Sequence, residues 1–209
     1  MRRLAALVLA LATAFVAPAL AGPADDFSFY VLALSWSPTF CATARYPAAE
    51  CGERRGFVVH GLWPQGETGF PHDCSRERGP SRRQMRALRD LMPDPSLIVH
   101  EWRAHGTCSG LDPERYFDLV RRASGRVVRP ARCADPESPP AVTSAAAVEA
   151  AFVAANPGLK PDMIAVECRS GRLSEVRICL DRGTLAFRPC PGVDRRACHA
   201  ARLSVPPAR

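Results

Sequence analysis

The fold and the chemistry are decided by two short stretches, Phe57-Val58-Val59-His60-Gly61-Leu62-Trp63-Pro64 and His100-Glu101-Trp102-Arg103-Ala104-His105-Gly106-Thr107-Cys108. Together they hold three of the five histidines, two of the three tryptophans and one carboxylate. Two histidines can cleave a phosphodiester without a metal, because one imidazole takes the proton of an attacking hydroxyl and the other protonates the leaving oxygen. The two stretches therefore predict an acid–base site.

The second stretch is expected to be helical and to present its polar side chains on one face. With about 100° per residue, an arc of about 140° from His100 holds Ala104, Glu101 and His105. Trp102 falls just outside it and is expected to face the core. Glu101 lies four residues before His105 and is expected to orient that imidazole and raise its pKa. Zinc proteases need two histidines at i and i+4, whereas His100 and His105 are five apart, so no metal is expected.

These stretches resemble the two active-site segments of the ribonuclease T2 family. The family's first segment ends in HGLWP, which 57–64 match throughout. Its second reads HEW, one residue, a basic residue and HGxC, and 100–108 match it except at Ala104. The stretch Leu34-Ser35-Trp36-Ser37-Pro38-Thr39-Phe40-Cys41 is similar to the family's first strand and loop. The resemblance runs from about Phe27 to Cys198.

The resemblance implies a metal-independent endoribonuclease without cofactors. Such an enzyme cleaves single-stranded RNA by transphosphorylation, through a 2′,3′-cyclic phosphate, to 3′-phosphate products. It implies His105 as general base, His60 as general acid and His100 as a phosphate ligand, with Glu101 polarising the phosphoryl group. Trp63 and Gln65 are expected to bind a base. DNA lacks the 2′-hydroxyl nucleophile and is expected to be neither partner nor substrate.

Ala104 keeps a second hypothesis open, because a basic residue there would stabilise charge that builds on the phosphoryl oxygens. A weakened or inactive family member could bind RNA or a protein partner instead. A third hypothesis is a small disulfide-rich binding module. The set of His60, Glu101 and His105 argues against both, since a pure binder needs no acid and base. We expect the enzyme to be active but slow, unless Arg103 or another arginine supplies the missing cation.

The first 21 residues read as a signal peptide. Arg2 and Arg3 precede an apolar run too short to span a bilayer, and Ala19-Leu20-Ala21 form a small-x-small cleavage site. We therefore expect a catalytic domain over residues 22–209, exported to the periplasm or outside the cell, monomeric and free of the membrane. A membrane anchor is the disfavoured alternative.

Nine cysteines together with an export signal predict disulfides. Eight cysteines can pair in 105 ways, so their spacing leaves the connectivity open. The resemblance implies the pairs Cys41–Cys51, Cys74–Cys108, Cys168–Cys198 and Cys179–Cys190, which leaves Cys133 over. A zinc site is disfavoured because the chain has no CxxC pair.

The formal net charge is +7, or +5 without Arg2 and Arg3, and a basic chain favours a polyanionic partner.

Strands are expected at 27–36, 56–63, 163–168, 172–179 and 184–187. Helices are expected at 81–91, from a Ser96 cap through the second stretch, from 112 or 113 to 125, and from 143 or 144 to 156, with a loop at 131–140. Strands and helices that do not alternate regularly predict an α+β fold. We expect one disulfide-stapled domain with a central antiparallel sheet flanked by helices.

Overall fold

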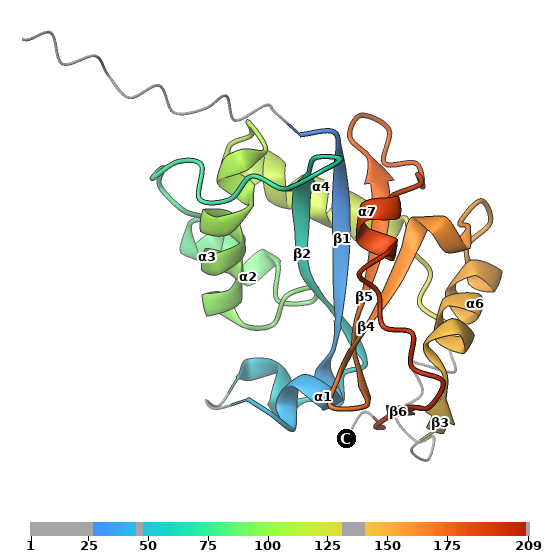
Figure 1. Cartoon of the computed structure of the whole chain (residues 1–209). Coiled ribbons are helices and arrows are strands. Elements are labelled where there is room, and N and C mark those ends of the chain that lie inside the picture. The colour runs from blue at the N-terminus through green and yellow to red at the C-terminus, as the bar shows by residue number, and fades with distance from the viewer. Residues whose placement is uncertain (1–26, 45–47, 131–140, 208–209) are drawn as a thin grey trace, which may run out of the picture.

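In the computed structural model of the chain, the described residues are 27–44, 48–130 and 141–207. They form a six-stranded sheet flanked by helices (Figure 1). The strands are β1 (Phe29–Trp36), β2 (Phe57–Gln65), β3 (Ala141–Thr143), β4 (Ile164–Arg169), β5 (Arg172–Asp181) and β6 (Leu203–Val205). The helices are α1 (Ser37–Cys41), α2 (Arg82–Ala87), α3 (Pro95–Ala104), α4 (Pro113–Gly125), α6 (Ala145–Ala155) and α7 (Pro191–Asp194).

The sheet is antiparallel except between β5 and β6. Its order is β2-β1-β5-β6-β3, and β4 also pairs with β5. Only β5 and β6 run parallel among the described strands, through the single pair Arg172 and Ser204. The predicted α+β fold is thereby confirmed.

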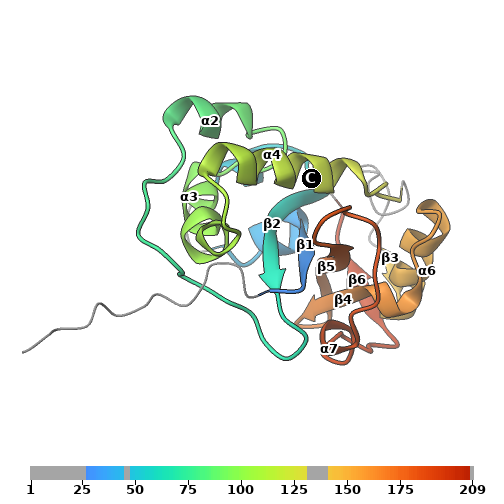
Figure 2. The same ribbon diagram turned by 90° about the horizontal axis from the view of Figure 1, so that it is seen from above.

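Both faces of the central strand β1 are buried. Leu32, Leu34 and Trp36 face the larger core, which α3, α4 and α6 close. Phe29 and Val31 point the other way, into a smaller cluster that includes Val193 of α7. Figure 2 shows α4 along one side of the sheet and α7 on the other. On this second face, α7 covers only one half of the sheet. The polar side chains of β2 and β5 lie on the other half.

The helix boundaries correct two expectations. Ser81 caps α2 through a capping box with Gln84, as its position suggests, but the helix ends at Ala87 rather than at 91. The cap of α3 is Asp94 and not Ser96, because Asp94 Oδ1 accepts the Ser96 N–H at 2.8 Å. Pro95 between them is suited to the first helical position, where its missing N–H costs nothing, so the cap precedes it.

The predicted strand at 184–187 is wrong. The side chain of Asp181 accepts backbone N–H bonds from Gly183 and Thr184, and Leu185 adopts a left-handed φ of 57°. This tight turn leaves one isolated bridge, between Leu180 and Phe187. The strands β3 and β6 were missed, because three residues are too short for a period-2 pattern.

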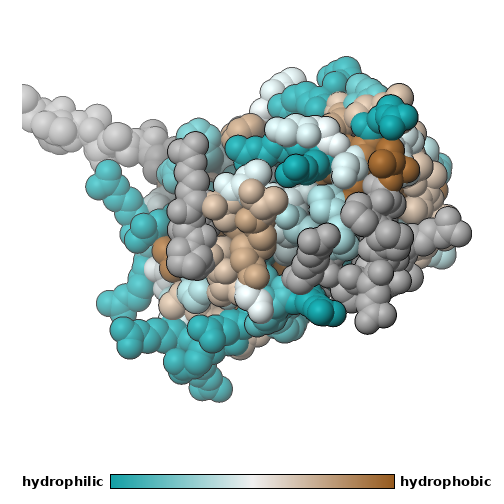
Figure 3. Space-filling model, turned by 90° about the horizontal axis from the view of Figure 1, so that it is seen from below, coloured by the Kyte–Doolittle hydropathy of each residue, from teal (hydrophilic) through white to brown (hydrophobic). Residues whose placement is uncertain are grey.

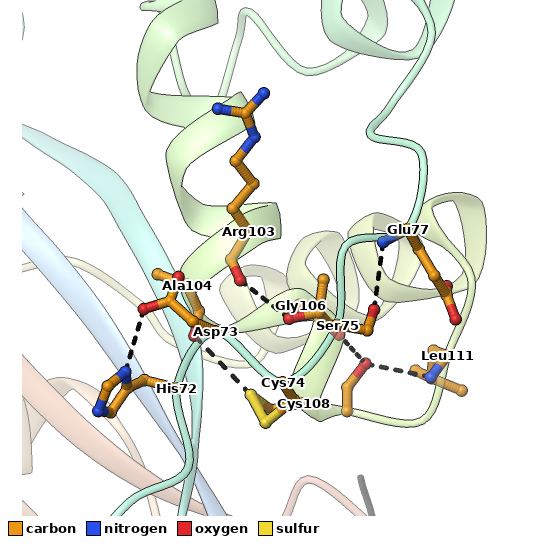
Figure 4. The surroundings of a disulfide bond; sticks show 12 residues. His72, Asp73, Cys74, Ser75, Glu77, Arg103, Ala104, Gly106, Cys108 and Leu111 are labelled. Atoms are coloured by element: carbon orange, nitrogen blue, oxygen red, sulfur yellow. Dashed lines mark hydrogen bonds and ion pairs between the residues drawn. A yellow bond between two sulfur atoms is a disulfide. The ribbon is translucent and has the colours of Figure 1, made fainter. Parts of the chain in front are cut away.

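Four disulfides staple the domain, and they are the four pairs that the resemblance implies: Cys41–Cys51, Cys74–Cys108, Cys168–Cys198 and Cys179–Cys190. Figure 4 shows how Cys74–Cys108 ties the segment after β2 to the turn that follows α3. The Asp73 N–H donates to the Ala104 carbonyl at 2.9 Å beside it. Cys133 and the loop expected at 131–140 lie outside the described residues.

Replacing Cys108 by serine is expected to lower both stability and activity. Loss of a native disulfide from a secreted domain typically costs about 2–5 kcal/mol, and this bond closes a loop between positions 34 apart, three residues after His105. Urea unfolding and RNA turnover measure the two effects. The control is Cys133→Ser, which is expected to change neither, and peptide mapping that places Cys133 in an intramolecular bridge would contradict this assignment.

Candidate active site

The structure brings His60, Glu101 and His105 together around the indole of Trp63. The Trp63 ring centroid lies 5.2 Å from that of His60 and 5.3 Å from that of His105. Its Nε1–H donates to Glu101 Oε2 at 2.7 Å. Trp63 thus holds the two imidazoles and the carboxylate in one cluster.

A β-bulge aims His60 into this cluster. Ala33 pairs with Gly61 and Leu34 with Val59, so His60 is the extra residue of β2. Bulges commonly re-aim a side chain next to a functional site. Gly61 is required for space, because a Cβ there would overlap the Glu101 carboxylate and the Trp63 indole. The HGLWP pattern is therefore a packing requirement as well as a chemical one.

The expected pairing of Glu101 with His105 is wrong. Glu101 Oε1 lies 3.5 Å from His60 Nε2, and the Glu101 side chain is only 1% exposed. The helix ends at Ala104, and His105 has left helical geometry with φ −127° and ψ −45°. The helical wheel therefore misplaces the His105 side chain, and Glu101 faces β2 instead.

Glu175 is a site residue that the sequence reading missed. The His60 Nδ1–H donates to Glu175 Oε2 at 2.6 Å. The two residues lie on β2 and β5, with β1 between them, and the intervening side chains are the small ones of Ala33 and Ser35. These leave room for His60 and Glu175 to meet above β1. The alternation of residues in β5 could have indicated this residue and Arg177. Glu175 and Arg177 lie on one face of the strand, and the buried apolar residues Val176, Ile178 and Leu180 lie on the other.

Arg177 is the second residue that was missed, and it places a cation at the site. Its Nε donates to Glu175 Oε1 at 2.8 Å, and its Nη1 lies 2.9 Å from Glu167 Oε1. Its Cζ lies 5.2 Å from the centroid of the Trp63 ring. Among the described residues, Nη2 has no hydrogen-bond partner, so one edge of the guanidinium remains available to a ligand.

The carboxylates favour the charged form of His60. Burial alone would lower the pKa of His60, but the hydrogen bond to Glu175 and the charge of Glu101 outweigh it, so the pKa is raised. Burial would raise the pKa of Glu175, yet the bond from His60 and the charge of Arg177 lower it. His60 is accordingly a proton donor held between two acidic groups.

His105 has the opposite character. Burial and the nearby charges of His100 and His60 lower its pKa to about 4. Its Nδ1 is buried without a hydrogen-bond partner among the described residues. Burial also raises the pKa of Glu101 to about 7, although His60 and Trp63 oppose the rise. His105 is therefore neutral over most of the pH range, and Glu101 retains its proton in mildly acidic solution.

A cavity of about 260 Å³ opens beside these groups, lined by Trp63, His105, Gln65, Phe70, Arg177 and Val193 among others. A second hollow of about 300 Å³ adjoins His60, Glu175 and Arg177. His100 is in the lining of neither hollow; its side chain is 66% exposed, and its Nε2 lies 4.0 Å from Glu101 Oε1. Trp102 is fully buried, as the sequence indicates.

Arg103 does not fill the gap at Ala104. Its side chain is exposed and lines neither hollow. Figure 4 shows it extended along α3, away from His72 and Asp73. A cation beside this cluster therefore comes from Arg177 of β5 and not from this helix.

No cluster of three or more metal-ligating side chains occurs in the described part of the chain. Separately, none of the helices that the structure describes is both long and apolar enough to cross a membrane.

Comparison with known proteins decides the family. The family model described as "Ribonuclease T2 family" matches residues 27–190. This chain belongs to the ribonuclease T2 family. A ribonuclease of Aeromonas hydrophila is 45% identical over 100 residues, which cover 47% of this chain and 46% of that protein. The chain thus spans about half the length of that curated relative.

Other T2 relatives cover more of the chain. Ribonuclease DdI of Dictyostelium discoideum is 26% identical over 200 residues, with 83% of this chain and 82% of that protein covered. The RNase-related protein from Calystegia sepium has a TM-score of 0.69 at 21% identity, covering 88% of this chain and 98% of its own. RNase NT, solved in complex with 5′-AMP, has a TM-score of 0.67 at 21% identity over 88% of this chain and 100% of its own. These structures share the T2 fold.

Proposed function

We propose that this T2 protein is a metal-independent endoribonuclease that cleaves single-stranded RNA through a 2′,3′-cyclic phosphate to 3′-phosphate products. One observation carries the proposal. Two imidazoles flank one indole beside a cavity, and their pKa values are shifted in opposite directions. Titratable groups whose environments push their pKa values apart are typical of an acid and a base that work as a pair.

In the first step, neutral His105 accepts the proton of the 2′-hydroxyl, and the 2′-oxygen attacks the adjacent phosphorus. His60 gives its proton to the departing 5′-oxygen, and the P–O5′ bond breaks. In the second step the roles reverse: His60 takes a proton from water, whose oxygen opens the cyclic phosphate, and His105 protonates the released 2′-oxygen. After the second step His60 is again protonated and His105 is again neutral, so the two histidines complete the cycle unchanged.

Charge on the phosphoryl oxygens is balanced by three groups. Protonated Glu101 can donate a hydrogen bond to one oxygen, which its pKa of about 7 permits below neutral pH. His100, whose Nε2 lies 4.0 Å from Glu101 Oε1, binds the phosphate. Arg177 supplies the cation that Ala104 cannot, through its unpaired Nη2. Preorganised donors of this kind are typically the largest electrostatic contribution to catalysis.

The base on one side of the scissile bond is proposed to enter the cavity of Trp63, Gln65 and Phe70. Stacking on an aromatic ring stabilises a base by about 1–3 kcal/mol. Gln65 is 7% exposed and can select among base edges by hydrogen bonding. Arg177 weakens the case for an inactive RNA- or protein-binding member, because it restores a cation to the site.

The proposed catalytic domain is residues 22–209, exported as a monomer after removal of residues 1–21, which lie outside the described residues. Four disulfides favour an oxidising compartment. RNA is the proposed partner.

Release of acid-soluble nucleotides from RNA in excess EDTA tests the function. We expect RNA to be degraded at an unchanged rate, and single-stranded DNA to remain intact because it carries no internal nucleophile. The products should include 2′,3′-cyclic phosphates at early times. Comparable degradation of DNA, or activity that EDTA abolishes and a metal restores, would rule out this mechanism.

The pH profile tests the roles of the histidines. The base must be deprotonated and the acid protonated, so kcat/KM should rise with pH through about 4, where the pKa of His105 lies. It should fall at higher pH, where His60, whose pKa is raised, and Glu101, whose pKa is about 7, lose their protons. Glu175→Gln removes the carboxylate that holds the His60 proton, so the pKa of His60 falls and the alkaline limb should move to lower pH.

The acid limb should stay in place in Glu175→Gln. Glu167→Gln is the matched control, because Glu167 binds Arg177 and is not bonded to His60. An alkaline limb that stays fixed in Glu175→Gln would mean that His60 is not the group that titrates there.

A further inference from the structure

A second basic surface lies outside the catalytic cluster, in the segment from 76 to 89. This arginine strip consists of six exposed residues: Arg76, Arg78, Arg82, Arg83, Arg86 and Arg89. Within the described part of the chain, none of the six has a side-chain hydrogen bond or an ion pair. Glu77 is the one acidic residue between them, and Asp90, which follows, is already bound by Arg121 at 2.7 Å.

Some arginines elsewhere in the domain are neutralised locally. Arg177 and Arg188 each bind a carboxylate at 2.8 Å. In the strip, Arg82 and Arg86 stand four apart on α2, an arrangement that destabilises a helix by like-charge repulsion. A polyanion relieves this repulsion and releases the counterions that the strip collects.

The strip is continuous with the catalytic end of α3. The segment after β2 passes from Phe70 at the cavity to Asp73, which is bonded to Ala104, and to Cys74, which is bonded to Cys108. Figure 2 shows this segment running along the outer side of α3 to α2. Figure 3 views the molecule from the side opposite to Figure 2, so the edge with α2 and α3, at the upper left of Figure 2, is at the lower left, where hydrophilic side chains project. An RNA chain that leaves the site on this side would pass the arginines of the strip one after another.

The chemistry of the strip fits a phosphodiester backbone better than a membrane. Guanidinium groups bind phosphate in a bidentate manner, and they do so independently of base sequence. Membrane-surface helices also need large apolar side chains to insert. The exposed large hydrophobic residues of the described chain are Phe70, Val128 and Val142, and none lies in the strip.

We propose that the arginine strip is a second RNA-binding surface, which holds the phosphates of a long substrate outside the cleft. The proposal rests on the ribonuclease function proposed above and adds the part of the substrate that the cleft does not reach. The strip raises the local concentration of long RNA and contributes nothing to the cleavage of a dinucleotide.

The test compares two triple variants with equal charge loss. The strip variant is Arg78→Gln, Arg82→Gln and Arg86→Gln, in which glutamine preserves helix propensity. The control variant is Arg126→Gln, Arg172→Gln and Arg202→Gln, which are exposed and lie outside the strip. Each is assayed on a dinucleotide and on long single-stranded RNA, and each is tested for binding to an uncleavable 2′-O-methyl oligonucleotide.

We expect the strip variant to retain dinucleotide kcat/KM and to lose long-RNA kcat/KM and oligonucleotide affinity, with the control near wild type. Each phosphate contact on a single strand contributes about 0.7 to the slope of log affinity against log salt. Loss of three contacts makes kcat/KM on long RNA roughly 20-fold less sensitive to a rise from 50 to 200 mM salt.

Equal losses in the two variants would overturn the proposal, because net charge alone would then explain them. A matching loss on the dinucleotide would also overturn it, since the strip would be acting through the cleft. Binding of the wild type to anionic vesicles, lost in the strip variant while oligonucleotide affinity persists, would assign the strip to a membrane instead. If the wild type cleaves no RNA, the ribonuclease function fails, and 2′-O-methyl binding still decides the strip.

Discussion

Replacing either His60 or His105 by alanine is expected to lower the turnover of RNA by about 10²–10⁴-fold while the fold persists. Each change removes one of the two proton-transfer groups on either side of Trp63. His199→Ala is the matched control, because that histidine is exposed and lies outside the site. Circular dichroism and urea unfolding check the fold of all three variants.

The two variants should differ on an activated substrate. A nucleoside 3′-phosphate ester of p-nitrophenol expels a stable anion that needs no proton. The His60→Ala variant should therefore recover most of its rate on that ester, whereas His105→Ala should not, because the 2′-hydroxyl still requires a base. If only His105→Ala recovered its rate on the ester, the roles of acid and base would be reversed. If either variant cleaved RNA within a few-fold of the wild-type rate, the replaced histidine would have no part in the mechanism. Glu101→Gln should cost less, since it transfers no proton in either step.

Arg177→Gln is expected to lower kcat by about 10²–10³-fold, the typical loss of one well-placed electrostatic donor. Ala104→Lys should raise kcat of the wild type more than it lowers KM, because the charge matters most in the transition state. In the Arg177→Gln background the gain from Ala104→Lys should be larger, since the lysine then replaces the cation that Arg177 supplied. Kinetics of the double-mutant cycle on one dinucleotide measure the coupling.

Two controls separate this role from others. Arg103→Ala should have little effect, because its side chain is exposed and extends along α3 without a side-chain bond to the described residues of the cluster. Arg177 also donates a hydrogen bond to Glu175, so the pH profile of Arg177→Gln must be recorded. A large shift of the alkaline limb with an unchanged maximal kcat would mean that Arg177 positions His60 through Glu175. If Arg177→Gln, Arg103→Ala and Ala104→Lys all leave kcat unchanged, this side of the cleft does not address the phosphate, and the role of His100 falls too.

The local sequence already contained much of the site. The HGLWP pattern predicted a strand that carries His60, and the structure adds that Gly61 is there to admit Glu101 and Trp63. Alternation and spacing predicted β1, β2, β4 and β5 and four helices, because these signals depend on neighbours along the chain. The identities of His60, Glu101 and His105 were readable for the same reason.

What the sequence by itself determined is therefore the α+β class, the family and the residues of the two stretches. Only the tertiary structure decided which carboxylate serves which histidine. Glu101 was assigned to His105 with a helical wheel, which is valid only for residues inside a helix. Because α3 ends at Ala104, His105 lies outside the helix and the wheel misplaces its side chain. Glu175 and Arg177 reach His60 and Trp63 across β1, and such a contact depends on strand order and register, which join residues more than 100 positions apart. The pKa shifts follow from that assembly, because burial and neighbouring charge exist only once the strands and α3 have met.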